Sequence, residues 1–194
     1  MPTITTTGAA RILSAAIGVR VRGERVARWA ESGLLTDHST LDAPRLRIDI
    51  AEATALGARL RRAPAGTCPH MAYRVSLSPL WESPLTDAQG NLWRTYAGVD
   101  HRHVLPAQER RRAVDGIWPV TASLADQLVA ADAWLLAADA GAVTPEHARV
   151  ITGWTRFEDR IAFTTRKADK ALRAWVGTGL LLDVPRGPIS ALYF

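Results

Sequence analysis

A proline- and glycine-rich stretch, APAGTCP at residues 63–69, sets the strongest limit on how this chain can fold. Proline and glycine interrupt helices and the inner parts of strands, so no regular element is expected to run through it. Residues 1–62 have a mostly helical pattern, whereas residues 70–194 mix helix-like and strand-like segments. The sequence therefore predicts two domains joined by a linker at residues 63–69.

Positive charge is concentrated before this linker. The chain has a net charge of +5, and residues 1–62 hold 10 arginines against 6 acidic residues. The remainder is nearly balanced, with 14 basic and 13 acidic residues. Of the basic residues, 22 are arginine and only 2 are lysine. Because arginine forms bidentate hydrogen bonds with phosphate and guanine, this pattern favours a nucleic-acid partner for the first domain.

Several other classes of protein are not expected. The sequence contains no run of 18 or more apolar residues, so we expect no membrane span. The first residues, MPTITTTGAARIL, lack the basic and apolar regions of a secretory signal. The single cysteine, Cys68, excludes an internal disulfide framework and is typical of a reducing compartment. A cytoplasmic location is therefore expected.

The N-terminal pattern predicts three helices and a short strand. A first helix ends at Gly18, and a second covers about residues 23–32. The alternation RLRI at residues 45–48 indicates a strand, placed in a hairpin. Asp49 followed by Glu52 is a capping-box pattern that opens a third helix, which extends to about residue 62.

These segments resemble a known family. TTTGAARIL, RVARWAESGLL and RLRIDIAEATAL are similar to the DNA-binding head of the MerR and phage-excisionase superfamily, over about a third of the chain. That resemblance implies a winged helix-turn-helix that binds double-stranded DNA. One departure is the segment ILSAAIGVRVRGERV, which is longer than the family spacing and can shift the aim of the second helix.

The resemblance also implies which side chains contact DNA. With Val26, Trp29 and Ala30 facing inward, the arginines of the second helix face outward. The N-terminal turn of that helix would read bases, Arg28 would clamp a phosphate, and the basic wing would follow the backbone. Glu24 can accept from a cytosine amino group or pair with Arg28. The predicted DNA-binding residues are Arg20, Arg22, Glu24, Arg25, Arg28, Arg45 and Arg47.

Residues 70–194 predict an α+β domain with a mostly antiparallel sheet covered by helices. The order of GIWPV, a strand, ITGW, RIAF and GPI is similar to small β-barrel domains of the PUA and EVE group, which implies recognition of nucleic acid or of a modified base. In that case Tyr96, Trp118 and Trp154 would form an aromatic pocket; the alternative is that they fill the core.

No enzyme, metal site or cofactor is expected. Cys68 and His70, with His101 and His103, offer four zinc ligands, but their one-residue spacings are not those of structural zinc sites. Asp100 next to His101 is only half of a general-base pair, and no G-x-S-x-G, H-E-x-x-H or glycine-rich phosphate loop accompanies it.

The sequence therefore predicts a sequence-selective duplex-DNA-binding protein, either a transcriptional regulator or a phage or plasmid accessory factor. A single head of this size makes few contacts, so we expect a homodimer or cooperative assembly on DNA. Two alternatives remain open: a nucleic-acid defence or processing protein whose C-terminal domain recognises a modified base, and a protein-interaction adaptor.

Overall fold

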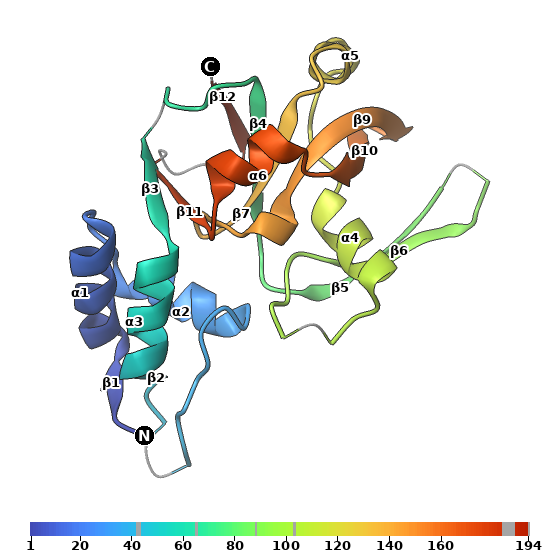
Figure 1. Cartoon of the computed structure of the whole chain (residues 1–194). Helices are drawn as coiled ribbons and strands as arrows, with labels where there is room; N and C mark the ends of the chain where they lie inside the picture. Colours follow the sequence, from blue (N-terminus) through green and yellow to red (C-terminus); the bar gives the residue numbers. More distant parts are fainter. Residues whose placement is uncertain (42–43, 65, 88, 103, 184–188, 194) are drawn as a thin grey trace.

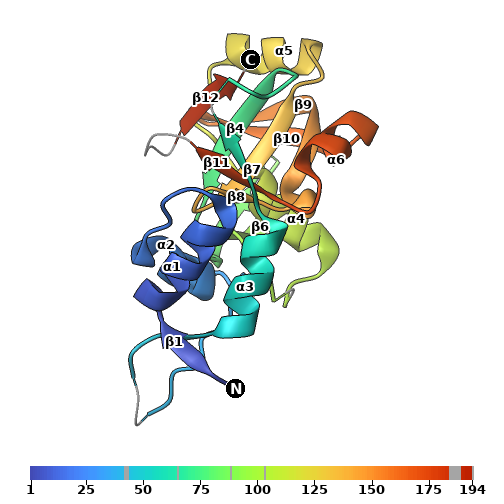
Figure 2. The same ribbon diagram turned by 60° about the vertical axis from the view of Figure 1, so that its left-hand side comes forward.

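The N-terminal part contains three short helices, as the sequence predicts. In the computed structural model of the chain they are α1 (Thr6–Ile17), α2 (Gly23–Glu31) and α3 (Ile50–Arg59). Figures 1 and 2 show α1 and α3 side by side, and α2 packs against α1. The structure describes residues 1–41, 44–64, 66–87, 89–102, 104–183 and 189–193.

Local signals set the ends of α1. The Thr5 side chain accepts a hydrogen bond from the backbone N–H of Gly8, which satisfies one of the free donors at the start of the helix. Gly18 ends the helix in the left-handed conformation (φ 76°), which glycine adopts without steric cost. The residues after Gly18 turn the chain toward α2. In this turn the N–H of Val21 donates to Ser14 Oγ of α1 at 2.9 Å.

The predicted strand at residues 45–48 is shifted along the chain. It is β2 (Arg47–Asp49), and it pairs antiparallel with β1 (Thr3–Thr5) at the start of the chain. Within the described residues, the hairpin expected after α2 is seen as a backbone hydrogen bond from the N–H of His38 to the carbonyl oxygen of Arg47 at 2.8 Å, while the extended pairing of β2 is with β1. Ile48 becomes buried beneath this two-stranded sheet.

The predicted capping box at α3 is only half formed. Asp49 Oδ1 accepts from the N–H of Glu52 at 3.0 Å, as expected. The Glu52 carboxylate, however, accepts from the N–H and hydroxyl of Thr36 instead of returning to the N–H of Asp49. It therefore ties the segment after α2 to the start of α3.

Replacing Asp49 with alanine is expected to lower the free energy of unfolding by about 1 kcal/mol, because the N–H of Glu52 loses its acceptor. Urea unfolding followed by circular dichroism measures this change. Asp49→Ser is the control, since serine keeps a side-chain acceptor and should recover most of the loss. Equal losses in the two variants would show that capping is not the reason.

The C-terminal part is built on one large, mostly antiparallel sheet, and the chain as a whole is α+β. Its central strands are β4 (Ala72–Leu77) and β7 (Trp134–Asp139), which are parallel. β12 (Ile189–Tyr193) flanks β4, while β9 (Ala148–Phe157) and β10 (Arg160–Lys167) continue antiparallel beyond β7. The segment after Thr144, which suits either a helix or a strand, forms a short 3-10 turn and then β9.

Both faces of this sheet are covered, which explains why every residue of β7 is buried. On one face, α4 (Ala107–Asp115) and α5 (Ala122–Ala130) pack on Tyr73, Leu135 and Ile151. On the other, α6 (Lys170–Val176) packs on Leu136 and Val150. The hairpin of β5 (Trp81–Thr86) and β6 (Leu92–Ala97) extends beside α4 (Figure 1).

The predicted linker is not a free connection between domains. Its first residues lie in β3 (Arg61–Pro64), which pairs in parallel with β11 (Leu180–Asp183), and β11 pairs with β8 (Ala142–Val143). The core of the N-terminal part, called the head core below, includes two residues from these later strands. It consists of Ala9, Ala10, Leu13, Ile17, Val21, Val26, Trp29, Ala30, Leu35, Ile48, Ala53, Leu56, Leu60, Ala142 and Leu181.

Within the described ranges, none of the helices has the length and apolar character needed to cross a membrane.

Candidate functional site

A basic cavity lies between α2 and the large sheet. Its volume is about 750 Å³, and its lining includes five arginines and two glutamates. α2 and the turn before it contribute most of these, while β4 and the turn after β7 contribute the opposite wall. The charged and polar residues that line it are Arg20, Arg22, Glu24, Arg25, Arg28, Glu31, Arg74 and Ser76. The excess of positive charge suits an anionic ligand.

The amphipathic pattern of α2 explains how these side chains reach the cavity. Val26, Trp29 and Ala30 are buried in the head core, so the remaining positions of the helix face away from it. Arg22 and Glu24, at the N-terminal end, are exposed. Arg28 Nη2 donates to the carbonyl oxygen of Leu77 at 3.3 Å, so the C-terminal half of α2 is in contact with β4.

Five of the predicted DNA-binding residues are therefore brought together, and two are not. Arg20, Arg22, Glu24, Arg25 and Arg28 all line the basic cavity. Arg45 and Arg47 are not among its lining residues. Arg45 is exposed before β2, and Arg47 is half-buried in β2, where its N–H donates to Asp37 Oδ1.

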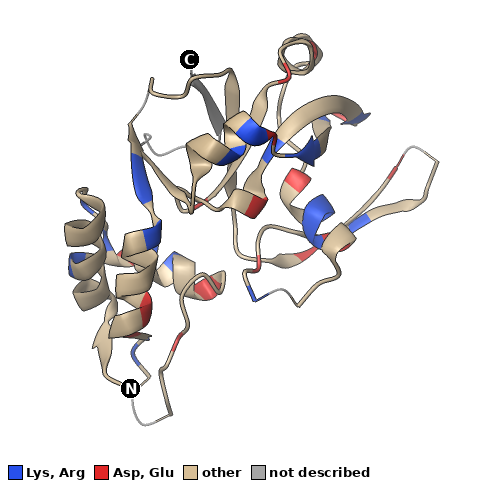
Figure 3. Ribbon diagram, viewed as in Figure 1, with Lys and Arg blue, Asp and Glu red and all other residues tan. Residues whose placement is uncertain are grey.

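Two residues of the opposite wall, Arg74 and Ser76, are absent from the predicted set. Arg74 is 6% exposed, which is unusual for an arginine and marks it as part of a built site. The signal was present in YRVSL, because alternation places Tyr73 and Val75 on one face and Arg74 on the other. An arginine in a strand of mostly apolar residues is typical of a binding residue or of a buried ion pair. Figure 3 shows further positive residues on β3, next to the head.

The predicted aromatic residues do not surround one cavity. Trp118 and Trp154 are half-buried against the core beneath α4 and α5, and their Nε1 groups donate to the carbonyl of Asp115 and the carboxylate of Asp126, both at 2.9 Å. Tyr96 lies in β6, opposite Glu82 of β5. None of the three lines the basic cavity. These contacts fit the alternative interpretation, in which the two tryptophans fill the core.

A buried polar junction connects the head to the sheet. Asp139, at the end of β7, is fully buried, and its Oδ2 accepts from Ser32 Oγ at 2.6 Å and lies 3.2 Å from His101 Nε2. The backbone carbonyl of Asp139 accepts from Trp29 Nε1 at 3.0 Å, and the N–H of His101 donates to the carbonyl of Ser32. Burial acts to lower the pKa of His101, but the carboxylates of Asp139 and Glu146 outweigh it and raise that pKa above its ordinary value.

Of the four residues considered for zinc, the three that the structure describes lie apart from one another. Cys68 is buried in the core beneath α6, and burial raises the pKa of its thiol. His70 packs on Trp134, with ring centroids 5.1 Å apart. His103 lies outside the described residues. His101 instead lies beside Glu146 and His147, which follow β8 about 45 positions later in the chain.

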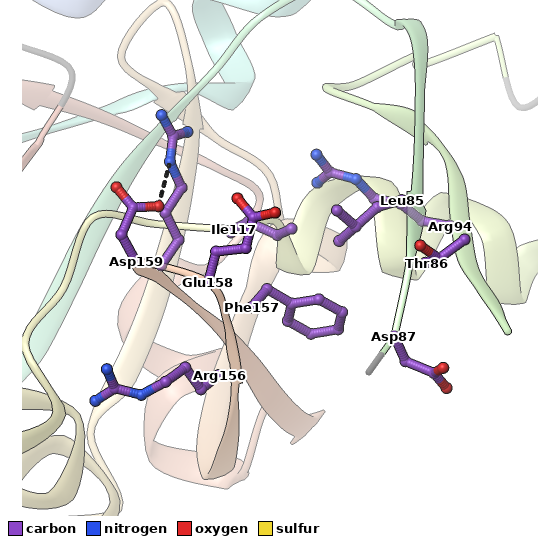
Figure 4. A pocket seen from close by; sticks show the side chains of 10 residues that line it. Leu85, Thr86, Asp87, Arg94, Ile117, Arg156, Phe157, Glu158 and Asp159 are labelled. Atoms are coloured by element: carbon purple, nitrogen blue, oxygen red, sulfur yellow. Dashed lines mark ion pairs between the residues drawn. The ribbon is translucent and has the colours of Figure 1, made fainter. Parts of the chain in front are cut away.

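A second cavity, of about 580 Å³, lies between the tip of the β9–β10 hairpin and the β5–β6 hairpin (Figure 4). Arginine and acidic residues alternate around it, and Arg160 Nε lies 3.9 Å from Asp159 Oδ1. Its charged lining residues are Asp87, Arg94, Arg156, Glu158, Asp159 and Arg160. Because the opposite charges balance, this cavity shows no preference for an anion, unlike the basic cavity beside α2.

No family model, curated protein or solved structure matches the chain, so its function has to be argued from the geometry of these sites.

Proposed function

We propose that this protein is a cytoplasmic, sequence-selective double-stranded DNA-binding protein, acting as a transcriptional regulator or a phage or plasmid accessory factor. In this proposal residues 1–62 act as a winged helix-turn-helix of the MerR and excisionase type. The protein binds DNA and carries out no catalysis itself.

The observation that supports this most is the gathering of Arg20, Arg22, Arg25 and Arg28 along one side of α2. An enzyme surface seldom needs so many cations together, whereas a phosphate backbone is attracted to such a cluster of positive charge. The order of α1, α2, β2 and α3, with the apolar side of α2 buried in the head core, also fits a helix that presents its polar side to DNA.

The contacts of α2 indicate which end of it would meet DNA. Its C-terminal half is held to the sheet through Trp29 and Arg28, although the Arg28 side chain remains exposed. Arg20, Arg22 and Glu24 are exposed at the N-terminal end. Helix-turn-helix proteins contact base edges with the N-terminal residues of the recognition helix, so this end is placed to read sequence while Arg28 contacts a phosphate.

A second head would be needed for tight binding. A small DNA-binding module buries only about 600–1,000 Å² of protein surface. We therefore propose that two copies act together on DNA, either as a homodimer or as cooperative neighbours. The role of the large sheet would then be to hold α2 in place and to support that assembly.

The test is selection of bound fragments from a random duplex library with the full chain, followed by affinity measurements over a series of salt concentrations. We expect an enriched sequence motif and a plot of log affinity against log salt with a slope of about −3 to −4, from four arginine–phosphate contacts. Absence of an enriched motif together with binding that does not depend on salt would overturn the proposal. Enrichment only from a library with modified bases would favour the modified-base alternative.

A further inference from the structure

Two histidines and a glutamate converge where the connection between β6 and α4 meets the segment after β8. One ligand atom from each of His101, Glu146 and His147 lies within 4.8 Å of the other two. Glu146 Oε1 is 3.7 Å from His101 Nδ1 and 4.0 Å from His147 Nε2. Donor atoms around a tetrahedral zinc ion lie about 3.3 Å apart, given metal–ligand distances of about 2.0–2.1 Å. Small side-chain movements would therefore bring the three atoms to the spacing of a metal site.

The remaining nitrogen of each histidine already has an orienting partner. His101 Nε2 lies 3.2 Å from Asp139 Oδ2, and His147 Nδ1 lies 3.1 Å from Thr144 Oγ1. Metal-binding histidines nearly always use their second ring nitrogen in this way, which fixes the ring and directs the other nitrogen at the metal. Here that arrangement leaves His101 Nδ1 and His147 Nε2 directed toward Glu146.

Charge and burial also suit a cation. The His101 and His147 side chains are 7% and 11% exposed, so they are held in place, whereas Glu146 at 47% leaves an entry from solvent. Asp139 Oδ1 is buried and has no hydrogen-bond partner among the described residues. The carboxylates of Asp139 and Glu146 together would offset the charge of a divalent ion. Imidazole nitrogens with one carboxylate favour zinc over magnesium or calcium.

A small pocket of about 150 Å³ adjoins this cluster, and its charge determines which fourth ligand a bound metal ion could take. Glu146 and His147 form part of its wall, opposite Arg110, Arg111 and Arg149. Arg111 and Arg149 lie 3.2 Å and 3.6 Å from the buried carboxyl group of Asp115, whereas Arg110 Nη1 donates to the carbonyl oxygen of Leu105. The excess of positive charge suits hydroxide or an oxyanion as the fourth ligand.

We infer that His101, Glu146 and His147 form a binding site for Zn²⁺, with a fourth position that opens toward the arginines of this pocket. The ion is held by His101 Nδ1, His147 Nε2 and the Glu146 carboxylate, and the two histidines are oriented by Asp139 and Thr144. The site does not depend on DNA binding, because none of its three ligands lines the basic cavity beside α2.

The test is zinc titration of the full chain, after removal of metal by a chelator, in competition with a chromophoric chelator. We expect one zinc ion per chain for the unchanged protein. Glu146→Gln should weaken binding by about tenfold or more, His147→Ala by about a hundredfold, and Thr144→Val by about tenfold. His70→Ala is the matched control and should stay within about twofold, because His70 packs elsewhere, against Trp134.

Cobalt provides a second readout of the ligands. Co²⁺ in place of Zn²⁺ should give the visible absorption of a four-coordinate site without a sulfur charge-transfer band. Circular dichroism will show whether His147→Ala folds. Because Glu146 is half-exposed, Glu146→Gln should keep the fold and tests the site even if His147→Ala does not fold. The inference is overturned if the unchanged chain binds no stoichiometric zinc, if Glu146→Gln keeps full affinity, or if a cobalt–sulfur band places Cys68 in the site.

Discussion

Replacing Trp29 with alanine is expected to lower the free energy of unfolding by about 3–5 kcal/mol, the cost typical of removing a large aromatic side chain from a core. Trp29 is fully buried in the head core. Its Nε1 also donates to the carbonyl oxygen of Asp139 at 3.0 Å, so the change leaves a buried acceptor without its donor. Urea unfolding followed by circular dichroism measures the loss.

Two other variants separate the loss of core packing from the loss of the hydrogen bond. Trp81 is 56% exposed on β5, so Trp81→Ala removes the same atoms from the surface and should change the stability by less than about 0.5 kcal/mol. Trp29→Phe keeps an aromatic ring in the head core but removes the donor, and should lose less than Trp29→Ala. A loss below about 1 kcal/mol for Trp29→Ala would contradict the packing described for the head core.

The position of Trp29 also determines how the protein should unfold. The head core contains Ala142 and Leu181, and β3 connects α3 directly to the large sheet through β11. Packing and hydrogen bonds thus cross the predicted domain boundary. Trp29→Ala should therefore shift the unfolding of the whole chain together, and two separate transitions would show that the head unfolds by itself.

Local signals allowed most helices and strands to be predicted from the sequence. Gly18 ends α1 because glycine adopts a left-handed conformation, and the Asp49 side chain caps α3, so both boundaries follow from residues close to them. In each case the decisive interaction lies within four residues of the boundary.

Contacts between distant segments could not be predicted in this way. β1 pairs with β2 although more than forty residues separate them, and the sequence of neither segment indicates that it pairs with the other. The closeness of His101 and His147 could not be predicted either. It depends on how β7 and β8 position the segment that follows them. The basic side chains in and just before α2 could be grouped from the sequence because they lie close together in the chain, whereas the position of Arg74 in the opposite wall depends on the sheet.

Substitutions in α2 test the proposed DNA interface. If DNA binding uses the N-terminal end of α2, Arg22→Ala combined with Arg25→Ala should weaken binding to the selected duplex by about 30-fold or more, since two lost contacts of about 1–3 kcal/mol each cost at least about 2 kcal/mol. The slope of log affinity against log salt should also fall by about 2, because two phosphate or base contacts are lost. Fluorescence anisotropy over a salt series measures both quantities.

The matched control removes the same charge from another surface. Lys170→Ala combined with Arg173→Ala also takes away two positive charges, and both residues are exposed on α6, on the opposite side of the large sheet from α4 and α5. General attraction between a basic protein and DNA would make the two double variants lose affinity equally. A specific role for α2 requires that the α6 variant stays within about twofold of the unchanged protein while the α2 variant loses both affinity and salt dependence. Equal losses, or an unchanged slope for the α2 variant, would remove α2 from the interface.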